Sequence, residues 1–318
     1  MKRLLFLFGA AFAFSCALAQ TWPSKPIQIV IPFGPGAASD MVSRRLADKL
    51  QASLGQPVIV INKAGASGQI AAEHVVKAVP DGYTLFLTSN TTHSANPFLY
   101  KKLAYDPVKD FTPIARVCDF PFVLVVDAKL PIKSVKELIA YSRNSGGKSS
   151  YGFGNSTGQI AGAALSRLMQ MDAAGVPYKS VPQVLTDLLG GQIQFAFLDM
   201  ANAFPQMQAG KLRALAVSSE TRSALTPGLP TIAEETGLRG FDLTAWGAVF
   251  GPAGLPKPIV DRLSSEIARI VTEPEFREKM QQIGVEIQSS TPEQLRQFVS
   301  QQLLVWGAKV KDAQIQPE

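Results

Sequence analysis

Short runs of apolar, β-branched residues alternate with helical patterns along nearly the whole chain, and this alternation limits the fold more than any other feature. Residues 27–31 form an almost continuous apolar run, as expected for a strand that is covered on both faces. A loop rich in glycine and proline follows, and residues 42–54 then place their leucines and a valine on one helical face before Gly55. Repeated strand–loop–helix units of this kind predict an α/β fold.

The pattern begins again at residue 122, and helices dominate the last third of the chain. A chain of 318 residues with this pattern is expected to form two lobes, and two buried parallel sheets would explain its low charged fraction of 18%. A strand expected at 212–218 could return to the first lobe. Further strands are expected at 58–61, 84–88, 122–126, 150–153 and 194–198, and further helices at 71–78, 134–142, 159–169, 184–189, 259–271, 275–283 and 292–313.

The first 19 residues have the three parts of a secretory signal peptide. Two basic residues precede an apolar run over 4–17, and an Ala-x-Ala cleavage site follows at 17–19. A membrane anchor is a weaker interpretation because the run is shorter than the roughly 18–20 residues that span a bilayer, and the surroundings of Cys16 match a lipoprotein motif poorly. Cleavage after residue 19 predicts an exported chain of 299 residues in which Cys118 is the one cysteine. We expect its thiol to be buried; a dimer-forming thiol is the alternative.

Composition argues against two classes of protein. Hydrophobic residues make up 46% of the chain, which excludes a disordered protein. The net charge of +6, or +4 once cleavage removes two basic residues, is spread along the sequence and is unlike the basic stripe of a nucleic-acid binder. A small positive excess suits the capture of small anions.

Two segments, 31–40 and 151–159, share one design in which a strand leads through a glycine-rich loop into a helix. Small residues let a ligand approach the backbone, and free N–H groups at a helix start attract anions. For either loop alone, tight turns and helix caps are the simpler explanation. One such loop in each half of the chain favours a ligand held between two lobes. Side chains that can add hydrogen bonds are Ser39, Asp40, Asn155, Ser156 and Thr157.

Two further polar features follow strands, where open α/β sheets bind ligands. The first is the run 88–93, which could bind a ligand or form an ordinary polar turn. The second is Asp199, which could accept a hydrogen bond from a ligand or cap a helix. Phe33 and Phe153 lie inside the two glycine loops, where core packing is the default role and contact with an apolar ligand is the alternative.

Enzyme motifs are weak in this chain. Residues 154–158 fit the G-x-S-x-G pattern of α/β-hydrolases, but that fold needs a histidine after its serine, and His74 and His93 both precede Ser156. The glycines of 152–158 are spaced one residue too far apart for a dinucleotide fingerprint, and neither a P-loop nor a metal-ligand spacing is present. We expect no catalysis, no metal and no cofactor; a periplasmic hydrolase that uses Ser156 is the alternative.

Many short sequence blocks occur in an order typical of one known family. They are 32–36 with Asp40, 55–58 leading to 62–66, 80–85, 89–90 with His93, 96–97, 105–111, 176–179, 185–191, 210–217 and 230–234. Each block is weak by itself, but the ordered set covers nearly the whole mature chain and is highly specific. On these residues the chain resembles the substrate-binding proteins of tripartite tricarboxylate transporters, also called Bug receptors.

The resemblance implies a clamshell protein of the type II periplasmic binding protein kind, with two doubly wound α/β lobes and a ligand cleft between them. Residues 20–118 and 220–318 would form lobe 1, and 119–219 lobe 2. A small carboxylate would bind mainly through backbone N–H groups, and hinge closure would trap it. The implied ligand-binding residues are Phe33, Gly36, Ala37, Ala38, Ser39, Asp40, Ser89, Asn90, Thr91, Phe153, Gly154, Asn155, Ser156, Thr157, Gly158 and Asp199.

The resemblance also implies partners and a compartment. The receptor would be a periplasmic monomer that delivers its ligand to a membrane permease of one large and one small subunit. Signalling to a membrane sensor kinase is an alternative output.

Some positions depart from the family pattern. The pair Ser180-Val181 replaces a common glycine pair, and Phe153 stands where many relatives have serine or alanine. If the Phe153 ring faces Phe33 across the cleft, an aromatic or elongated dicarboxylate such as terephthalate is favoured. If both loops bind an anion, Gly36→Asp and Gly154→Asp should abolish binding while the protein stays folded.

Overall fold

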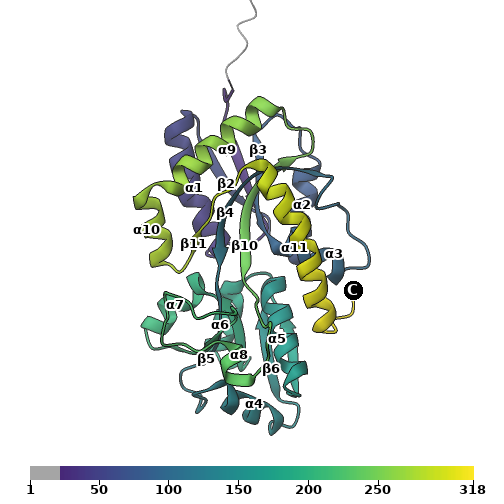
Figure 1. Cartoon of the computed structure of the whole chain (residues 1–318), viewed down its shortest axis with the longest axis vertical. Coiled ribbons are helices and arrows are strands. Elements are labelled where there is room, and N and C mark those ends of the chain that lie inside the picture. The colour runs from purple at the N-terminus through teal and green to yellow at the C-terminus, as the bar shows by residue number, and fades with distance from the viewer. Residues whose placement is uncertain (1–21) are drawn as a thin grey trace, which may run out of the picture.

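The computed structural model describes residues 22–318, which form two lobes that lie one above the other in Figure 1. The expected signal peptide at 1–19 lies outside the described residues. Each lobe is built on one β-sheet, and the chain crosses between them twice, once near Pro121 and once near Thr244. None of the helices within 22–318 is long and apolar enough to cross a membrane.

The first lobe contains a six-stranded sheet of mixed direction, in the order β11-β4-β10-β3-β1-β2. β1 runs parallel to β2 and β3, whereas β10 is antiparallel to both β3 and β4. The strands are β1 Ile27–Ile31, β2 Val58–Asn62, β3 Thr84–Ser89, β4 Phe111–Phe120, β10 Ala245–Pro252 and β11 Glu286–Ile287.

Helices cover both faces of this sheet because its strands alternate their buried side chains between two cores. Ile29 packs with α1 and α9 on one face, and Val30 packs with α2 and α11 on the other. α1 ends at Gly55, whose φ of 69° is the left-handed conformation expected of a helix C-cap glycine. The helices are α1 Ala38–Leu54, α2 Gln69–Val76, α3 Asn96–Leu99, α9 Lys257–Thr272, α10 Pro274–Gln282 and α11 Pro292–Asp312.

The second lobe contains a five-stranded sheet in the order β7-β6-β8-β5-β9. β6 is parallel to β7 and β8, and β5 is antiparallel to β8 and β9. The strands are β5 Phe122–Asp127, β6 Ser149–Phe153, β7 Ala173–Pro177, β8 Phe195–Asp199 and β9 Leu212–Val217. The helices are α4 Val135–Arg143, α5 Ser156–Leu168, α6 Val181–Leu189, α7 Met200–Gln208 and α8 Ile232–Thr236.

The expectation of two parallel sheets is wrong, because both sheets are mixed. Burial on both faces makes a strand apolar whichever way it runs, so composition does not reveal strand direction. The antiparallel strands β5 and β10 are those through which the chain enters lobe 2 and returns to lobe 1. β9 stays in the second lobe beside β5 and does not return to the first.

Residues 219–243 pack with the second lobe, where the expected division at residue 220 would put them in the first. Val217 forms a β-bridge with Thr231, and α8 packs against α4. The Ser218 hydroxyl donates a hydrogen bond of 2.8 Å to the Leu243 carbonyl, so this segment returns to the end of β9 before it leaves the lobe. We therefore propose residues 22–120 with 245–318 as lobe 1, and 122–243 as lobe 2.

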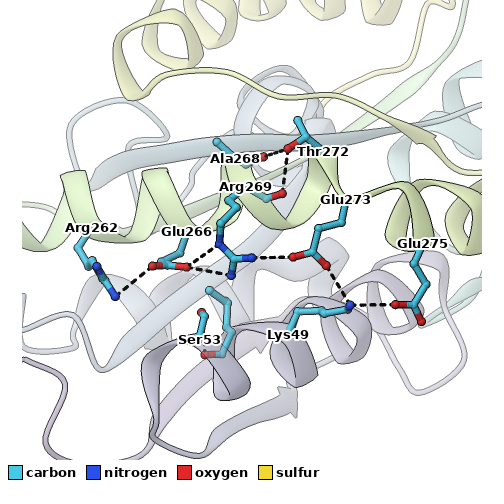
Figure 2. Close-up of polar contacts among 10 residues, drawn as sticks. Lys49, Ser53, Arg262, Glu266, Ala268, Arg269, Thr272, Glu273 and Glu275 are labelled. Atoms are coloured by element: carbon cyan, nitrogen blue, oxygen red, sulfur yellow. Dashed lines mark hydrogen bonds and ion pairs between the residues drawn. The ribbon is translucent and has the colours of Figure 1, made fainter.

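Ion pairs tie α1 to the junction of α9 and α10 (Figure 2). The Lys49 ammonium lies 2.9 Å from Glu273 and 3.2 Å from Glu275, and Arg269 lies 2.7 Å from Glu273. These side chains are partly exposed, so solvent screens each pair and its contribution to stability is small.

The Cys118 thiol is fully buried on β4, which confirms the expectation of a buried cysteine. Burial raises the pKa of this thiol well above its ordinary value.

Candidate ligand-binding cleft

A pocket lies between the lobes, and both lobes contribute to its lining. The cavity is narrow, with a volume of about 30 Å³, which is room for roughly two water molecules at about 10–15 Å³ each. The first crossing supplies the aromatic rings of Phe120 and Phe122, and the second supplies Ala245. The lining residues are Phe33, Ala37, Ala38, Ser39, Ser89, Asn90, Thr91, Phe120 and Ala245 from lobe 1, and Phe122, Asn155, Thr157, Val181 and Asp199 from lobe 2.

The start of α1 presents uncapped backbone N–H groups at this pocket. Ala37 is the N-cap residue and has no side chain that could accept from the first turn. The Ser39 hydroxyl, 4% exposed, lines the pocket and has no hydrogen-bond partner within the described chain. Free N–H groups, the positive end of a 17-residue helix and a free hydroxyl together make this end of α1 suitable for an anion.

Asp40 supports the first loop from behind and does not line the pocket. Its carboxylate accepts hydrogen bonds of 3.0 Å from the Gly36 N–H, 3.1 Å from Arg44 and 2.9 Å from Asn62. Burial opposes the ionisation of Asp40, but these hydrogen bonds outweigh it and hold its pKa below the ordinary value. The loop is therefore fixed in shape before any ligand binds.

Three helices of lobe 2 also begin at the pocket. Asn155 caps α5 by accepting 2.9 Å from the Gly158 N–H, and Asp199 caps α7 by accepting 3.0 Å from the Asn202 N–H. α6 begins at Ser180, whose side chain makes no capping hydrogen bond. The positive ends of four helices, counting α1, thus meet at one cavity.

Asp199 is a buried carboxyl group at this otherwise anion-attracting position. It is 3% exposed, and burial raises its pKa, an effect that the hydrogen bonds from Asn202 only partly oppose. The group therefore caps a helix, as one of the two sequence interpretations had it, and it also lines the pocket; its role as a ligand-facing acceptor stays a prediction.

Hydrogen bonds between side chains join the lobes directly beside the cavity. The Asn90 side-chain amide donates 2.9 Å to the Thr157 hydroxyl, and the Ser156 hydroxyl donates 3.0 Å to the Thr91 hydroxyl. All four residues are at most 1% exposed. These bonds stabilise the closed arrangement of the lobes without any ligand.

The polar run after β3 is a buried π-helical turn, Thr91–Ala95, and not an exposed loop. His93 belongs to this turn. Its ring stacks on Phe250 with ring centroids 4.1 Å apart, and its Nδ1 forms a 2.9 Å hydrogen bond with the Thr92 hydroxyl. Complete burial lowers the pKa of His93 to about 3, so the ring is neutral at physiological pH. This packing positions Asn90 and Thr91 at the cavity.

Ten of the sixteen positions expected from the sequence line the pocket, and six do not. Those outside the lining are Gly36, Asp40, Phe153, Gly154, Ser156 and Gly158. The Phe153 ring packs beside Tyr151, with ring centroids 6.0 Å apart, so the expected pairing of Phe153 with Phe33 across the cleft is not present. Phe120, Phe122, Val181 and Ala245 line the pocket and were missed. A signal for Val181 did exist, in the unusual Ser180-Val181 pair.

A family model described as "Tripartite tricarboxylate transporter family receptor" matches residues 42–315. The chain belongs to this family. The resemblance inferred from the sequence blocks is thereby confirmed. Among proteins of related sequence, protein BugT of Bordetella pertussis is 34% identical over 321 residues, which covers 98% of each chain. A UPF0065 protein of Pseudomonas sp. strain P51 is 33% identical over 96% of this chain and 92% of its own length.

Solved structures of periplasmic binding proteins share the fold of this receptor. The structure of R. palustris Rpa4515 with adipate matches with a TM-score of 0.90 at 32% identity, covering 93% of this chain and 100% of that one. Periplasmic binding protein BugD gives 0.88 at 33% over the same shares. MatC of Rhodopseudomonas palustris, with bound malate, gives 0.85 at 32% over 91% of this chain and 100% of that one. The fold is the two-lobed α/β fold of periplasmic solute-binding proteins.

Proposed function

We propose that this receptor binds a small dicarboxylate between its lobes and delivers it to the membrane subunits of a tripartite tricarboxylate-type transporter. The observation that carries the proposal is the start of α1, where an uncapped helix end and the unpartnered Ser39 hydroxyl face a pocket shared by both lobes. Such a helix end stabilises one carboxylate. The start of α6, at Ser180, also lacks a side-chain cap and is the position we propose for the second carboxylate, although Pro182 leaves fewer free N–H groups there than at the start of α1.

Recognition through backbone groups fits the charges of the site. The lining residues include neither lysine nor arginine among residues 22–318, so charge neutralisation falls to N–H groups, hydroxyls and helix dipoles. A cavity of about 30 Å³ is too small for a dicarboxylate. The lobes therefore part to admit it and close on it, as a clamshell receptor does.

The ligand class follows from the relatives and the lining. Solved relatives hold adipate and malate, both dicarboxylates. Phe33, Phe120 and Phe122 supply apolar surface for the carbon chain between the carboxylates. Because Phe153 does not face the cleft, a flexible aliphatic diacid is favoured over an aromatic one such as terephthalate.

We propose that the receptor performs no catalysis. The Ser156 hydroxyl is fully buried and bonds with Thr91, and the ring of His93 bonds with Thr92. A serine nucleophile needs a base within hydrogen-bond reach. A hydrolase would show ester hydrolysis that Ser156→Ala removes, and we expect equal, background rates for both proteins.

Titration calorimetry of the mature protein with succinate, malate, adipate, terephthalate, citrate and glutamate tests the proposal. We expect tightest one-to-one binding to an aliphatic dicarboxylate. Binding of none of the six would contradict the function, and tightest binding to glutamate or terephthalate would contradict the ligand class. Gly36 is exposed, lies outside the lining and has a left-handed φ of 82°, so Gly36→Asp is expected to strain the first loop and to weaken binding together with stability.

A further inference from the structure

We propose that Ser180 and Val181, at the start of α6, limit the length of the dicarboxylate, and that Gly34 is the point of lobe 1 on which they close. This inference rests on the proposed function and adds which residues select among diacids. Val181 was not among the expected binding residues, although it lines the pocket and is only 4% exposed.

The glycine-rich loop of lobe 1, at Gly34 and Gly36, approaches the start of α6 in lobe 2. A Cβ atom added to Gly34 would lie 3.1 Å from the Ser180 hydroxyl oxygen and 3.6 Å from the Ser180 Cβ. A Cβ added to Gly36 would lie 3.7 Å from Pro182. Pro35 and Gly36 are exposed, so this approach lies at the solvent side of the cleft, whereas the buried crossing residues Phe120 and Phe122 lie at its base.

The start of α6 is supported from behind and cannot retreat from a larger ligand. A Cβ on Gly154 would lie 2.4 Å from the Ser180 carbonyl carbon and 2.5 Å from the Val181 nitrogen, which means that the two backbones are in direct contact. The backbone of 180–181 is thus held between the 153–155 loop and the cavity. A wall that is fixed in this way selects by size, because a longer ligand meets the Val181 side chain or keeps the lobes apart.

The sizes of the Ser180 and Val181 side chains are expected to set which diacid binds best. Removing methyl groups from Val181 enlarges the cavity at its lobe 2 end, and removing the Ser180 side chain widens the approach to Gly34. Each added methylene in an apolar pocket changes binding by roughly 10- to 200-fold. We therefore expect the smaller side chains to shift the relative affinities towards longer diacids.

The first experiment measures calorimetric affinities for succinate, glutarate, adipate and pimelate. Val181→Ala is expected to raise the affinity ratio of pimelate to succinate at least tenfold. Val184→Ala is the matched control, because Val184 is buried on the same helix but packs in the lobe 2 core away from the pocket. Thermal unfolding verifies that both variants are folded. An unchanged ratio in Val181→Ala, or an equal shift in Val184→Ala, would overturn the size-limiting role.

The second experiment tests the approach of Gly34 to Ser180. Gly34→Ala is expected to weaken binding of every diacid about three- to tenfold. Ser180→Gly in the same chain should restore the affinity, because it removes the Ser180 hydroxyl oxygen, the one atom closer to the added Cβ than ordinary van der Waals contact. Gly228→Ala is the control, since a Cβ there meets nothing within 4 Å. Full affinity in Gly34→Ala, or a double variant as weak as the single one, would overturn the contact.

The two experiments also separate this inference from the proposed function. If the parent binds no diacid, both the proposed function and this inference are wrong. If the parent binds a diacid and the variants bind it equally well, only this inference is wrong.

Discussion

The side-chain amide of Asn90 donates a 2.9 Å hydrogen bond to the Thr157 hydroxyl, and this bond joins the two lobes beside the ligand cavity. Asn90 is held by the π-helical turn that follows β3, and Thr157 belongs to the first turn of α5. Both are fully buried, so opening the cleft exchanges this bond for bonds to water. Part of the free energy of closure therefore comes from the protein itself.

Thr157→Val is expected to weaken dicarboxylate binding about tenfold. The closed state would then contain an unpaired, buried Asn90 amide, and leaving such a donor unsatisfied costs about 1–3 kcal/mol. The open state does not incur this cost because water reaches the amide. Calorimetry with the best diacid measures the effect. Thr272→Val is the control, because Thr272 is exposed and its hydroxyl donates only to the Ala268 and Arg269 carbonyls of its own helix (Figure 2). Equal affinities of parent and Thr157→Val would show that the bond does not contribute to closure.

Gly154→Ala is expected to destabilise the protein by several kcal/mol. The added Cβ would lie 2.4 Å from a backbone carbon of Ser180, and backbone atoms cannot move aside as a flexible side chain can. The expectation that Gly154→Asp leaves the protein folded is therefore replaced by one of unfolding or strong destabilisation. Urea unfolding measures it, with Gly228→Ala as the control that should lose little. A Gly154→Ala protein of parental stability would contradict the packing described for 153–155 and 180–181.

The stability of Asp199→Asn relative to the parent is expected to increase as the pH rises. Burial raises the pKa of Asp199, so the folded protein keeps its proton to a higher pH than the unfolded chain does. Above the ordinary carboxyl range, ionising this group therefore lowers the stability of the parent. Asparagine keeps the capping oxygen and cannot ionise. The difference in unfolding free energy between variant and parent should grow between pH 4 and 8, and a constant difference would mean that Asp199 titrates normally.

His93 is expected to make the parent less stable in acid. Burial lowers its folded pKa to about 3, whereas the unfolded chain binds a proton near the ordinary value of 6.5. Between those values the unfolded state alone is protonated, so stability falls as the pH decreases, by about 2 kcal/mol from pH 6.5 to 4.5. His93→Gln should lose most of this dependence in urea unfolding, while His74→Gln, at an exposed position on α2, should keep it. Parallel pH profiles of the parent and His93→Gln would contradict the buried neutral ring.

The sequence predicts the local elements of this fold well because periodicity and caps are local properties. α1 and its end at Gly55 follow from the spacing of apolar residues and one glycine. The direction and order of the strands do not follow, because β5 and β10 owe their antiparallel pairing to two crossings between lobes. These depend on contacts between residues far apart in the sequence, such as Phe122 with Asp199 and Gly247 with Ser89.

The same distinction applies to the site. Ser39 and Thr157 could be predicted because a glycine-rich loop before a helix has a sequence pattern. The sequence does not predict Phe120, Phe122 and Ala245 as lining residues. They flank the two crossings between lobes, and only the folded chain brings those crossings together at one cavity. Phe153 shows the opposite error: Asn155 and Thr157 of its segment line the pocket, but β6 places Phe153 on the same face as Tyr151, and its ring packs there.

The most direct test of the central claim, that the start of α1 binds a carboxylate of the ligand, is a calorimetric comparison of the parent with Ser39→Ala and Ser39→Asp. A hydrogen bond to a charged group contributes about 1.5–3 kcal/mol, so Ser39→Ala should weaken binding of the best diacid roughly 10- to 100-fold. Ser39→Asp, which places a carboxylate where the ligand's own would lie, should abolish it, and both variants should unfold cooperatively. Parental affinity in Ser39→Asp would contradict the account.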